Sequence, residues 1–249
     1  MHSWNRRIPI SVPARRCSSA SAVSSAIATD ARPVATSASL RLRIEAPREV
    51  TGEGFRGTAT LGGPELWVTG SQDRPVDVTI FTVRTDTHRD LDDPISCAIS
   101  PIERISSRSI PGQIKVSGAY VNSFHARRTA EQAGFSDGLM FDREGHLAEA
   151  SAANVFLIER GRLITPRLKP DVFPGITRAV ILELVRGLGI EVEELEIDRM
   201  RLAAVQGAFV CSTLMEIRGL DRLGERKLPT VELAQFRSVV REFRALTHS

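Results

Sequence analysis

The sequence predicts an α+β fold, because hairpins and isolated helices are mixed and do not alternate as they do in a doubly wound sheet. Residues 137–151 ("DGLMFDREGHLAEAS") read as a hairpin with a turn at 142–145. Residues 153–166 ("ANVFLIERGRLITP") read as a second hairpin with a turn at 159–162. Residues 174–189 and 230–247 carry the apolar periodicity of amphipathic helices.

The remaining elements follow from strand, turn and cap signals along the chain. Strands are predicted at residues 40–44, 66–70, 76–83, 93–100, 191–197 and 207–213. Glycine-rich connections are predicted at residues 51–57 and 60–64. A helix is predicted at 118–134 with its end at Gly134, and a short helix at 198–205 with Asp198 as its cap.

Composition divides the chain into three parts. Residues 1–39 are rich in Ser, Ala and Arg, and their single acid is Asp30. This composition predicts a disordered leader, and an organelle transit peptide or a misplaced start codon would look the same. Residues 40–108 are expected to form a partial N-terminal domain and residues 109–249 the C-terminal domain.

The charge balance argues against nucleic acid and membrane partners. The net charge is only +3, acids and bases are interleaved, and no apolar run reaches the length of a membrane span. The three cysteines lack the spacing of metal ligands, and their odd number favours a reducing compartment. We therefore expect small-molecule substrates and a cytoplasmic location, with organelle targeting by residues 1–39 left open.

Lys115 is a candidate nucleophile. The chain contains only three lysines, Lys115, Lys169 and Lys227, and Lys115 lies in the apolar run "QIKVSG", which reads as a strand. An amine in an apolar setting can form a Schiff base, which a guanidinium cannot do. The alternative is a lysine whose stem packs while its head reaches water.

Two further residues could serve the same ligand. Tyr120, the single tyrosine of the chain, follows Lys115 by five residues, where its phenol could bond a ligand oxygen. Glu149 lies among small residues that leave room for a flat ligand. The alternatives are a core aromatic for Tyr120 and a solvent-facing acid at a strand edge for Glu149.

Two segments could hold a phosphate. The Pro-Gly turn of "FPGITRA" opens a helix and leaves the N–H groups of Ile176 and Thr177 free for an anion. The strand "FVCST" ends in Ser212 and Thr213, whose hydroxyls could form a second clamp. Either segment taken alone is also compatible with an ordinary helix start or strand end. Taken together, the lysine, carboxylate, phenol and phosphate donors fit pyridoxal 5'-phosphate (PLP).

The chain resembles the class IV (fold-type IV) PLP-dependent aminotransferases over about half its length. The matching stretches are "KVSGAYVNS", "AGFSDGLMFDREGHLAEASAANVFLI", "LITPRL", "FPGITRAVILEL" and "FVCSTLMEI". The resemblance implies a small N-terminal α/β domain and a larger C-terminal α/β pseudo-barrel. The N-terminal block with a phosphate-binding arginine that is usual in this family is not recognisable here. The resemblance therefore implies an atypical or truncated N-terminal domain.

The resemblance also implies a role for each candidate residue. Lys115 would carry the Schiff base and move the substrate proton, Glu149 would hold the pyridine nitrogen protonated, and Tyr120 would bond the phenolic oxygen of the ring. Ile176, Thr177 and Thr213 would hold the phosphate. Thr213 and Leu214 would offer N–H groups to the substrate carboxylate.

Three functions follow from the resemblance as alternatives. The first is a branched-chain-like aminotransferase that moves an amino group between an amino acid and a 2-oxo acid. The second is a lyase similar to the aminodeoxychorismate lyases, and the third is a non-catalytic truncated homologue. Members of the family are usually homodimers, so a homodimer is expected.

Overall fold

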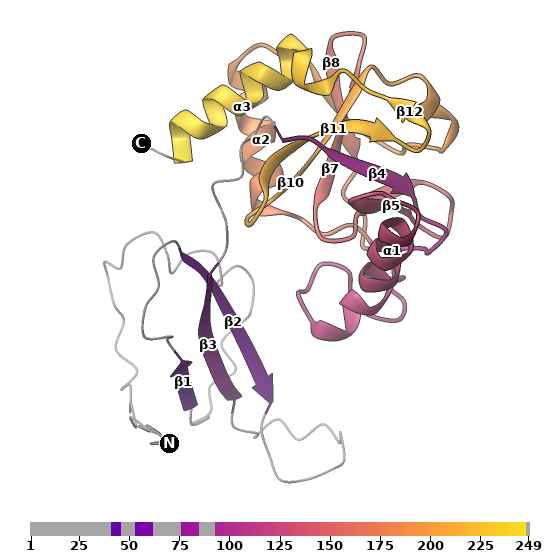
Figure 1. The fold of residues 1–249 in the computed structure, drawn as a ribbon. Coiled ribbons are helices and arrows are strands. Elements are labelled where there is room, and N and C mark those ends of the chain that lie inside the picture. The colour runs from indigo at the N-terminus through magenta and orange to yellow at the C-terminus, as the bar shows by residue number, and fades with distance from the viewer. Residues whose placement is uncertain (1–40, 46–52, 62–75, 85–92, 248–249) are drawn as a thin grey trace. The chain divides into compact units, whose positions relative to one another are not determined.

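The computed structural model describes residues 41–45, 53–61, 76–84 and 93–247 of the 249-residue chain (Figure 1). The chain divides into two compact units, residues 1–87 and 88–249.

The N-terminal unit contains a three-stranded sheet in the order β1-β3-β2. Its strands are β1 Arg41–Glu45, β2 Glu53–Leu61 and β3 Val76–Arg84. The predicted strands at 40–44 and 76–83 are therefore confirmed, whereas the strand predicted at 66–70 lies outside the described residues. The glycine-rich connections predicted at 51–57 and 60–64 are wrong where they overlap β2. Gly54 and Gly57 pair with Val83 and Ile80 in an antiparallel ladder, which overrides the weak strand preference of glycine.

The C-terminal unit is built on a mixed, nine-stranded sheet in the part of the chain that the structure describes. The strand order is β6-β5-β4-β11-β10-β7-β8-β9, and β12 pairs with β11. The strands are β4 Ile95–Ile99, β5 Asp137–Phe141, β6 Leu147–Ala150, β7 Asn154–Glu159, β8 Arg162–Pro166, β9 Val192–Leu195, β10 Gly207–Ser212, β11 Glu216–Leu223 and β12 Arg226–Lys227. Both predicted hairpins are confirmed, as β5–β6 and β7–β8.

The two ends of this sheet meet, so the sheet curls into the expected pseudo-barrel. His146, just before β6, forms an antiparallel bridge with Asp198, which follows β9. The N–H of Leu147 donates to the carbonyl of Ile197 at 2.7 Å. Because this seam joins the first and last strands of the order, β6 is hydrogen-bonded on both sides.

Successive residues of the central strands pack into two different cores. On β7, Val155 and Leu157 belong to the core inside the curled sheet. Phe156 and Ile158 face the other way and pack in a second core with residues of the helices α2 (Ile176–Gly187) and α3 (Ala234–Thr247). This alternation is the period of two that strand geometry imposes.

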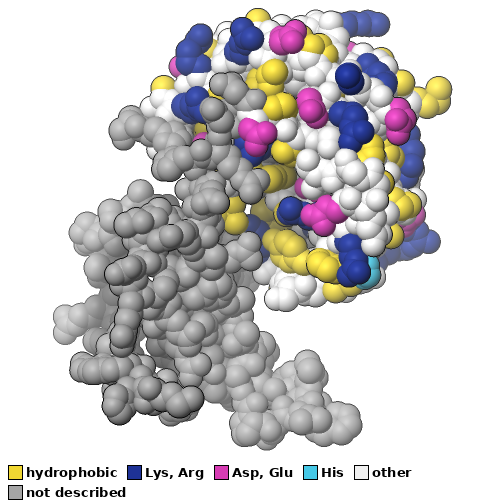
Figure 2. Space-filling view, in the orientation of Figure 1, with side chains coloured by type: hydrophobic (Ala, Val, Ile, Leu, Met, Phe, Trp, Pro, Cys, Tyr) yellow, Lys and Arg dark blue, Asp and Glu magenta, His cyan; other side chains and the backbone are white. Residues whose placement is uncertain are grey.

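The helices lie close to where the sequence predicts them. They are α1 Tyr120–Gln132, α2 Ile176–Gly187 and α3 Ala234–Thr247, with short 3-10 helices at η1 Ser117–Ala119, η2 Met200–Ala203 and η3 Thr230–Glu232. Gly134 ends α1 with a φ of 78°. The Asp198 carboxylate accepts the N–H of Arg201 at 2.8 Å, as its capping role predicts. On the face of the C-terminal unit seen in Figure 2, acidic and basic side chains are interspersed.

The packing of α1 on β5 generates the first prediction. A Cβ added at Gly138 would lie 3.0 Å from the backbone oxygen of Ala126 in α1. We expect Gly138→Ala to lower the free energy of unfolding by about 1–3 kcal/mol, measured by urea denaturation. The matched control is Gly187→Ala, where a Cβ meets no atom within 4 Å, so this variant should be neutral or slightly stabilised. Equal stability of the two variants would contradict the close approach.

Candidate active site

Glu149 lies at the centre of the candidate site. It is carried by β6, whose four residues are all buried, and only 5% of its surface is exposed. Its Oε1 atom lies 2.7 Å from Nε of Arg104. Its Oε2 atom accepts the N–H of Phe173 and the amide N–H of Asn154, each at 3.3 Å. The alternative of a solvent-facing acid at a strand edge is therefore wrong.

Arg104 connects this carboxylate to the start of α1. The residue is 7% exposed, and its backbone N–H donates to the carbonyl of Phe141 at 2.8 Å. Its Nη1 atom donates to the carbonyl of Ala119 at 3.4 Å. The Nε–H is not aimed along the short contact with Glu149, so the two side chains form an ion pair without a well-aligned hydrogen bond.

The electrostatics of Glu149 place its titration near neutrality. Burial raises the pKa of Glu149 from 4.5 to about 7, while the charge of Arg104, the N–H of Phe173 and the charge of Lys115 act in the opposite direction. A carboxyl group with this pKa can exchange a proton with a ligand at physiological pH. Perturbed groups of this kind are typical of functional sites.

Lys115 lies near enough to Glu149 for its charge to act on that carboxyl, although its setting differs from the expected one. It is exposed and occupies a non-strand segment between a turn at 112–114 and η1. The predicted apolar strand is wrong because the N–H of Ile114 turns back to the carbonyl of Pro111 at 3.4 Å. Its Nζ atom lies 5.3 Å from the ring centroid of Phe173, the residue whose N–H contacts Glu149. The structure thus brings Lys115 and Glu149 together around Phe173.

Tyr120 begins α1 and is 40% exposed, so the alternative of a core aromatic is wrong. It follows Ala119, whose carbonyl accepts a hydrogen bond from Arg104. The contacts of Arg104 with Glu149 and with the carbonyl of Ala119 therefore link the first turn of α1 to the buried carboxylate.

The N-terminus of α2 is open to an anion. The N-cap residue is Gly175, so no side chain caps the helix at this position. The first turn contains no acid. Ile176 is 59% exposed, while Thr177 is buried. The first N–H groups of a helix lack intrahelical acceptors, and such groups bind phosphate well.

Asn154 fixes the turn that leads into α2. Its Nδ2 atom donates to the carbonyl of Phe173 at 2.9 Å, in addition to its contact with Glu149. Its Oδ1 atom would overlap a Cβ added at Gly175. Only glycine allows this approach, so Asn154 holds the N-terminus of α2 close to the start of β7.

Thr213 and Leu214 stand apart from this network. Both are exposed in the turn between β10 and β11, where Ser212 Oγ accepts the N–H of Met215 at 3.2 Å. Within residues 93–247, no hydrogen bond or ion pair joins either residue to Lys115 or Glu149. Their roles stay predictions.

Sequence reasoning missed Arg104, Asn154 and Phe173. Asn154 carries a usable signal, because a buried amide at the start of an apolar strand needs partners. Arg104 and Phe173 reach Glu149 only through tertiary structure, so no local pattern reveals them. The buried carboxylate, the adjacent amine and the uncapped helix start fit a flat cofactor with a ring nitrogen, a carbonyl and a phosphate.

This combination of a curled mixed sheet, a buried carboxylate and a neighbouring lysine defines the class of the protein. The family model "Amino-transferase class IV" matches residues 2–223, and the chain belongs to this family. The match begins inside residues 1–39, for which the composition predicts a leader. That segment lies outside the described residues, so its disorder stays a prediction.

Individual relatives point the same way. The chain is 33% identical over 168 residues to the "Probable branched-chain-amino-acid aminotransferase" of Aquifex aeolicus, which covers 67% of this chain and 54% of that protein. The branched-chain aminotransferase of Thermoproteus uzoniensis with norvaline matches with a TM-score of 0.72 and 26% identity, over 77% of this chain and 63% of that one. The PLP-form of the Thermobaculum terrenum enzyme matches with a TM-score of 0.68 and 27% identity, over the same shares. The chain spans about half the length of the curated relatives it matches.

The raised pKa of Glu149 generates the second prediction. Since the folded-state pKa lies above the ordinary value of 4.5, the carboxyl stabilises the fold below about pH 4.5, and this contribution is lost as the pH rises through about 7. The amide side chain that Glu149→Gln introduces does not lose a proton in this pH range, unlike the carboxyl group of glutamate. The stability of the cofactor-free variant relative to wild type should therefore rise between pH 5 and 8, by on the order of 2–3 kcal/mol.

Urea unfolding at several pH values measures this difference. Glu131→Gln is the matched control, because it makes the same change of side chain at an exposed position of α1. A flat difference for Glu149→Gln would show that burial does not govern this carboxyl.

Proposed function

We propose that the protein is a PLP-dependent aminotransferase that moves an amino group between an amino acid and a 2-oxo acid. The observation that carries this proposal is the buried Glu149, which is paired with Arg104 and accepts the N–H of Phe173, whose ring centroid lies 5.3 Å from Nζ of Lys115. Membership of the class IV family supports the same activity.

When bound, PLP supplies an electron sink that stabilises negative charge developing on the substrate carbon. Glu149 would hold a proton on the ring nitrogen, which keeps that sink strong. Its pKa of about 7 lets the proton lie between the carboxylate and a pyridine nitrogen at neutral pH.

Lys115 would anchor the cofactor through Nζ and then move the proton at the substrate Cα. Its exposure in a non-strand segment leaves the long stem free to reach two positions. Tyr120, at the start of α1, would donate to the phenolic oxygen. Ile176 and Thr177 would hold the phosphate through the uncapped first turn of α2, and Thr213 would add its hydroxyl from the β10–β11 turn.

The substrates that we propose are branched-chain or other hydrophobic amino acids and their 2-oxo acids. The names of the similar proteins support this choice. Thr213 and Leu214 would offer N–H groups to the substrate carboxylate, because both lie exposed in a turn at the end of a buried strand.

We also propose that the enzyme works as a homodimer in the cytoplasm. Val121 and Phe124 of α1 are 54% and 61% exposed, and large exposed apolar side chains favour a protein interface.

Cys97 and Cys211 are free and buried, which fits a reducing compartment. None of the helices in the described part of the chain combines the length and the apolar character that a membrane span requires.

The third prediction concerns Lys115. Lys115→Ala should remove the visible absorption of the lysine-bound cofactor and lower turnover by about 10²–10⁴-fold. Borohydride should fix the cofactor mass on the peptide that contains Lys115 in the wild type. The control Lys227→Ala, an exposed lysine on β12, should keep both properties. A mass found on another lysine would overturn the assignment.

The fourth prediction separates the alternatives. We expect transfer from leucine, isoleucine or valine to 2-oxoglutarate, followed as the new 2-oxo acid by chromatography. Pyruvate released from aminodeoxychorismate without an acceptor would instead favour the lyase. A folded protein with neither reaction would favour a non-catalytic homologue.

A further inference from the structure

Lys169 lies outside the site described above, yet it is one of only three lysines in the chain. It belongs to residues 167–175, which we call the connecting segment because they run from the end of β8 to the start of α2. The side chain is 24% exposed, so most of its length is packed against the protein.

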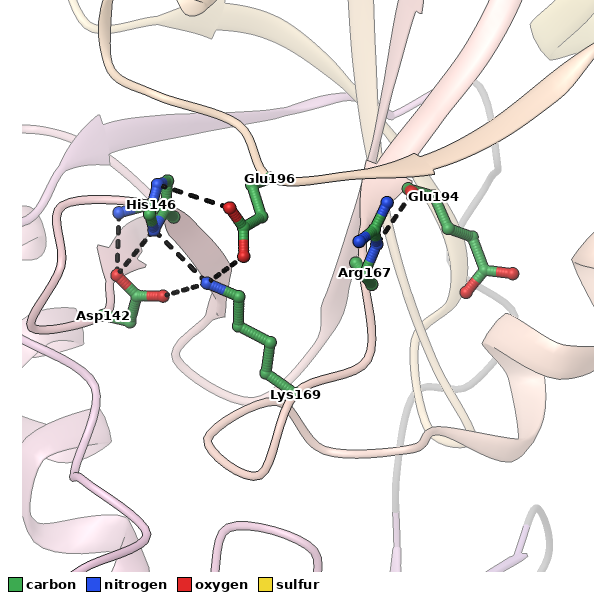
Figure 3. Close-up of polar contacts among 6 residues, drawn as sticks. All are labelled: Asp142, His146, Arg167, Lys169, Glu194 and Glu196. Atoms are coloured by element: carbon green, nitrogen blue, oxygen red, sulfur yellow. Dashed lines mark hydrogen bonds and ion pairs between the residues drawn. The ribbon is translucent and has the colours of Figure 1, made fainter.

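The amine of Lys169 is surrounded by three polar groups (Figure 3). Nζ lies 2.8 Å from Oε1 of Glu196 and 3.3 Å from Oδ2 of Asp142. It also lies 3.3 Å from Nδ1 of His146, whose own ring faces the same two carboxylates at 3.6 and 3.8 Å. These contacts join the connecting segment to two other segments of the curled sheet.

The Asp142 carboxylate that pairs with Lys169 is itself held in place by the protein. The side chain of Asp142 is 2% exposed, and its Oδ1 atom accepts the N–H of His146 at 2.7 Å across the β5–β6 turn. Glu149 is on the same hairpin, on strand β6. Lys169 therefore ties the connecting segment to the hairpin that carries the buried carboxylate.

A second anchor holds the beginning of the segment to β9 but not to the hairpin. The backbone N–H of Arg167 donates to the carbonyl of Leu195 at 2.8 Å. The Nε atom of Arg167 donates to the carbonyl of Glu194 at 3.4 Å (Figure 3). Without Lys169, this end would keep its link to β9 and lose its link to the hairpin turn.

The far end of the segment carries the groups that the site uses. Phe173 donates its N–H to Glu149 at 3.3 Å, and its ring lies below the amine of Lys115. Gly175 opens α2, where Ile176 and Thr177 follow. Between the two ends, the carbonyl of Lys169 accepts the N–H of Val172 at 3.0 Å, so a single short turn separates Lys169 from Phe173.

Lys169 keeps its charge over the working pH range. Burial lowers its pKa, but the hydrogen bond to Glu196 and the charge of Asp142 outweigh burial and raise the pKa above its ordinary value. The ammonium group is therefore a constant link between the two carboxylates and does not act as a titrating switch.

We propose that Lys169 is a positioning residue, which holds the connecting segment so that Phe173 and the N-terminus of α2 meet the cofactor ring and phosphate. This inference rests on the proposed function for the identity of the cofactor. The observation that supports the positioning role is the contact of Lys169 with Asp142 and Glu196. Asp142 lies on the same hairpin as Glu149.

The test compares Lys169→Met, Lys169→Arg and the exposed control Lys227→Met in the full chain. Three quantities are measured for each: the Kd for PLP by titration of the cofactor-free protein, the urea midpoint without PLP, and hydrogen exchange of peptides within residues 167–176. We expect Lys169→Met to weaken PLP binding on the order of tenfold and to speed exchange in those peptides. Lys169→Arg should restore most of the affinity, because it keeps a charged donor.

An unchanged Kd for Lys169→Met would overturn the proposal. So would a urea midpoint that falls together with faster exchange over β5, β6 and β9, because Lys169 would then serve only the seam of the sheet. If the wild type does not bind PLP, the proposed function fails on its own. In that case exchange confined to residues 167–176 supports the positioning role, and unchanged exchange there refutes it.

Discussion

The ion pair between Glu149 and Arg104 is the constraint on which the site depends, because both charges are buried. A buried carboxylate without partners would lose its charge, and a buried guanidinium without partners would destabilise the fold. Arg104 occupies one oxygen, while Phe173 and Asn154 occupy the other. These three partners come from separate segments: after β4, before α2 and at the start of β7. The site exists only when all three segments are in place.

Closure of the curled sheet keeps this arrangement in register. Leu147 and His146 bond to the residues that follow β9, and Glu149 lies two positions further along β6. A slip of one residue in β6 would turn Glu149 to the opposite face of the sheet. The seam therefore protects the orientation of the carboxylate, and the contacts of Lys169 with Asp142 and Glu196 lie on the same seam.

Turn and helix-start residues in the sequence predicted the elements whose conformation depends on a few neighbouring residues. The turn at Arg160 and Gly161 has positive φ at both residues, which suits a tight hairpin, and the Pro-Gly start of α2 is visible in the sequence. The glycines of β2 concealed a strand that forms through its pairing with β3. Strand β11 was missed because Arg218, Gly219 and Asp221 interrupt its apolar pattern, and its neighbours β10 and β4 supply the ladder instead.

For Lys115, the chemical role was easier to predict from the sequence than the local backbone structure and the exposure of the side chain. Its residue type and its place in the matching stretch "KVSGAYVNS" pointed to a Schiff-base lysine, whereas the apolar strand expected around it is an exposed, turned segment. An exposed stem is better suited to the proposed role, because one amine must serve both the cofactor and the substrate carbon. The Phe173 ring, 5.3 Å from Nζ, gives that amine an apolar surface without enclosing it. Phe173 also donates its backbone N–H to Glu149, so one residue contacts both the amine and the carboxylate.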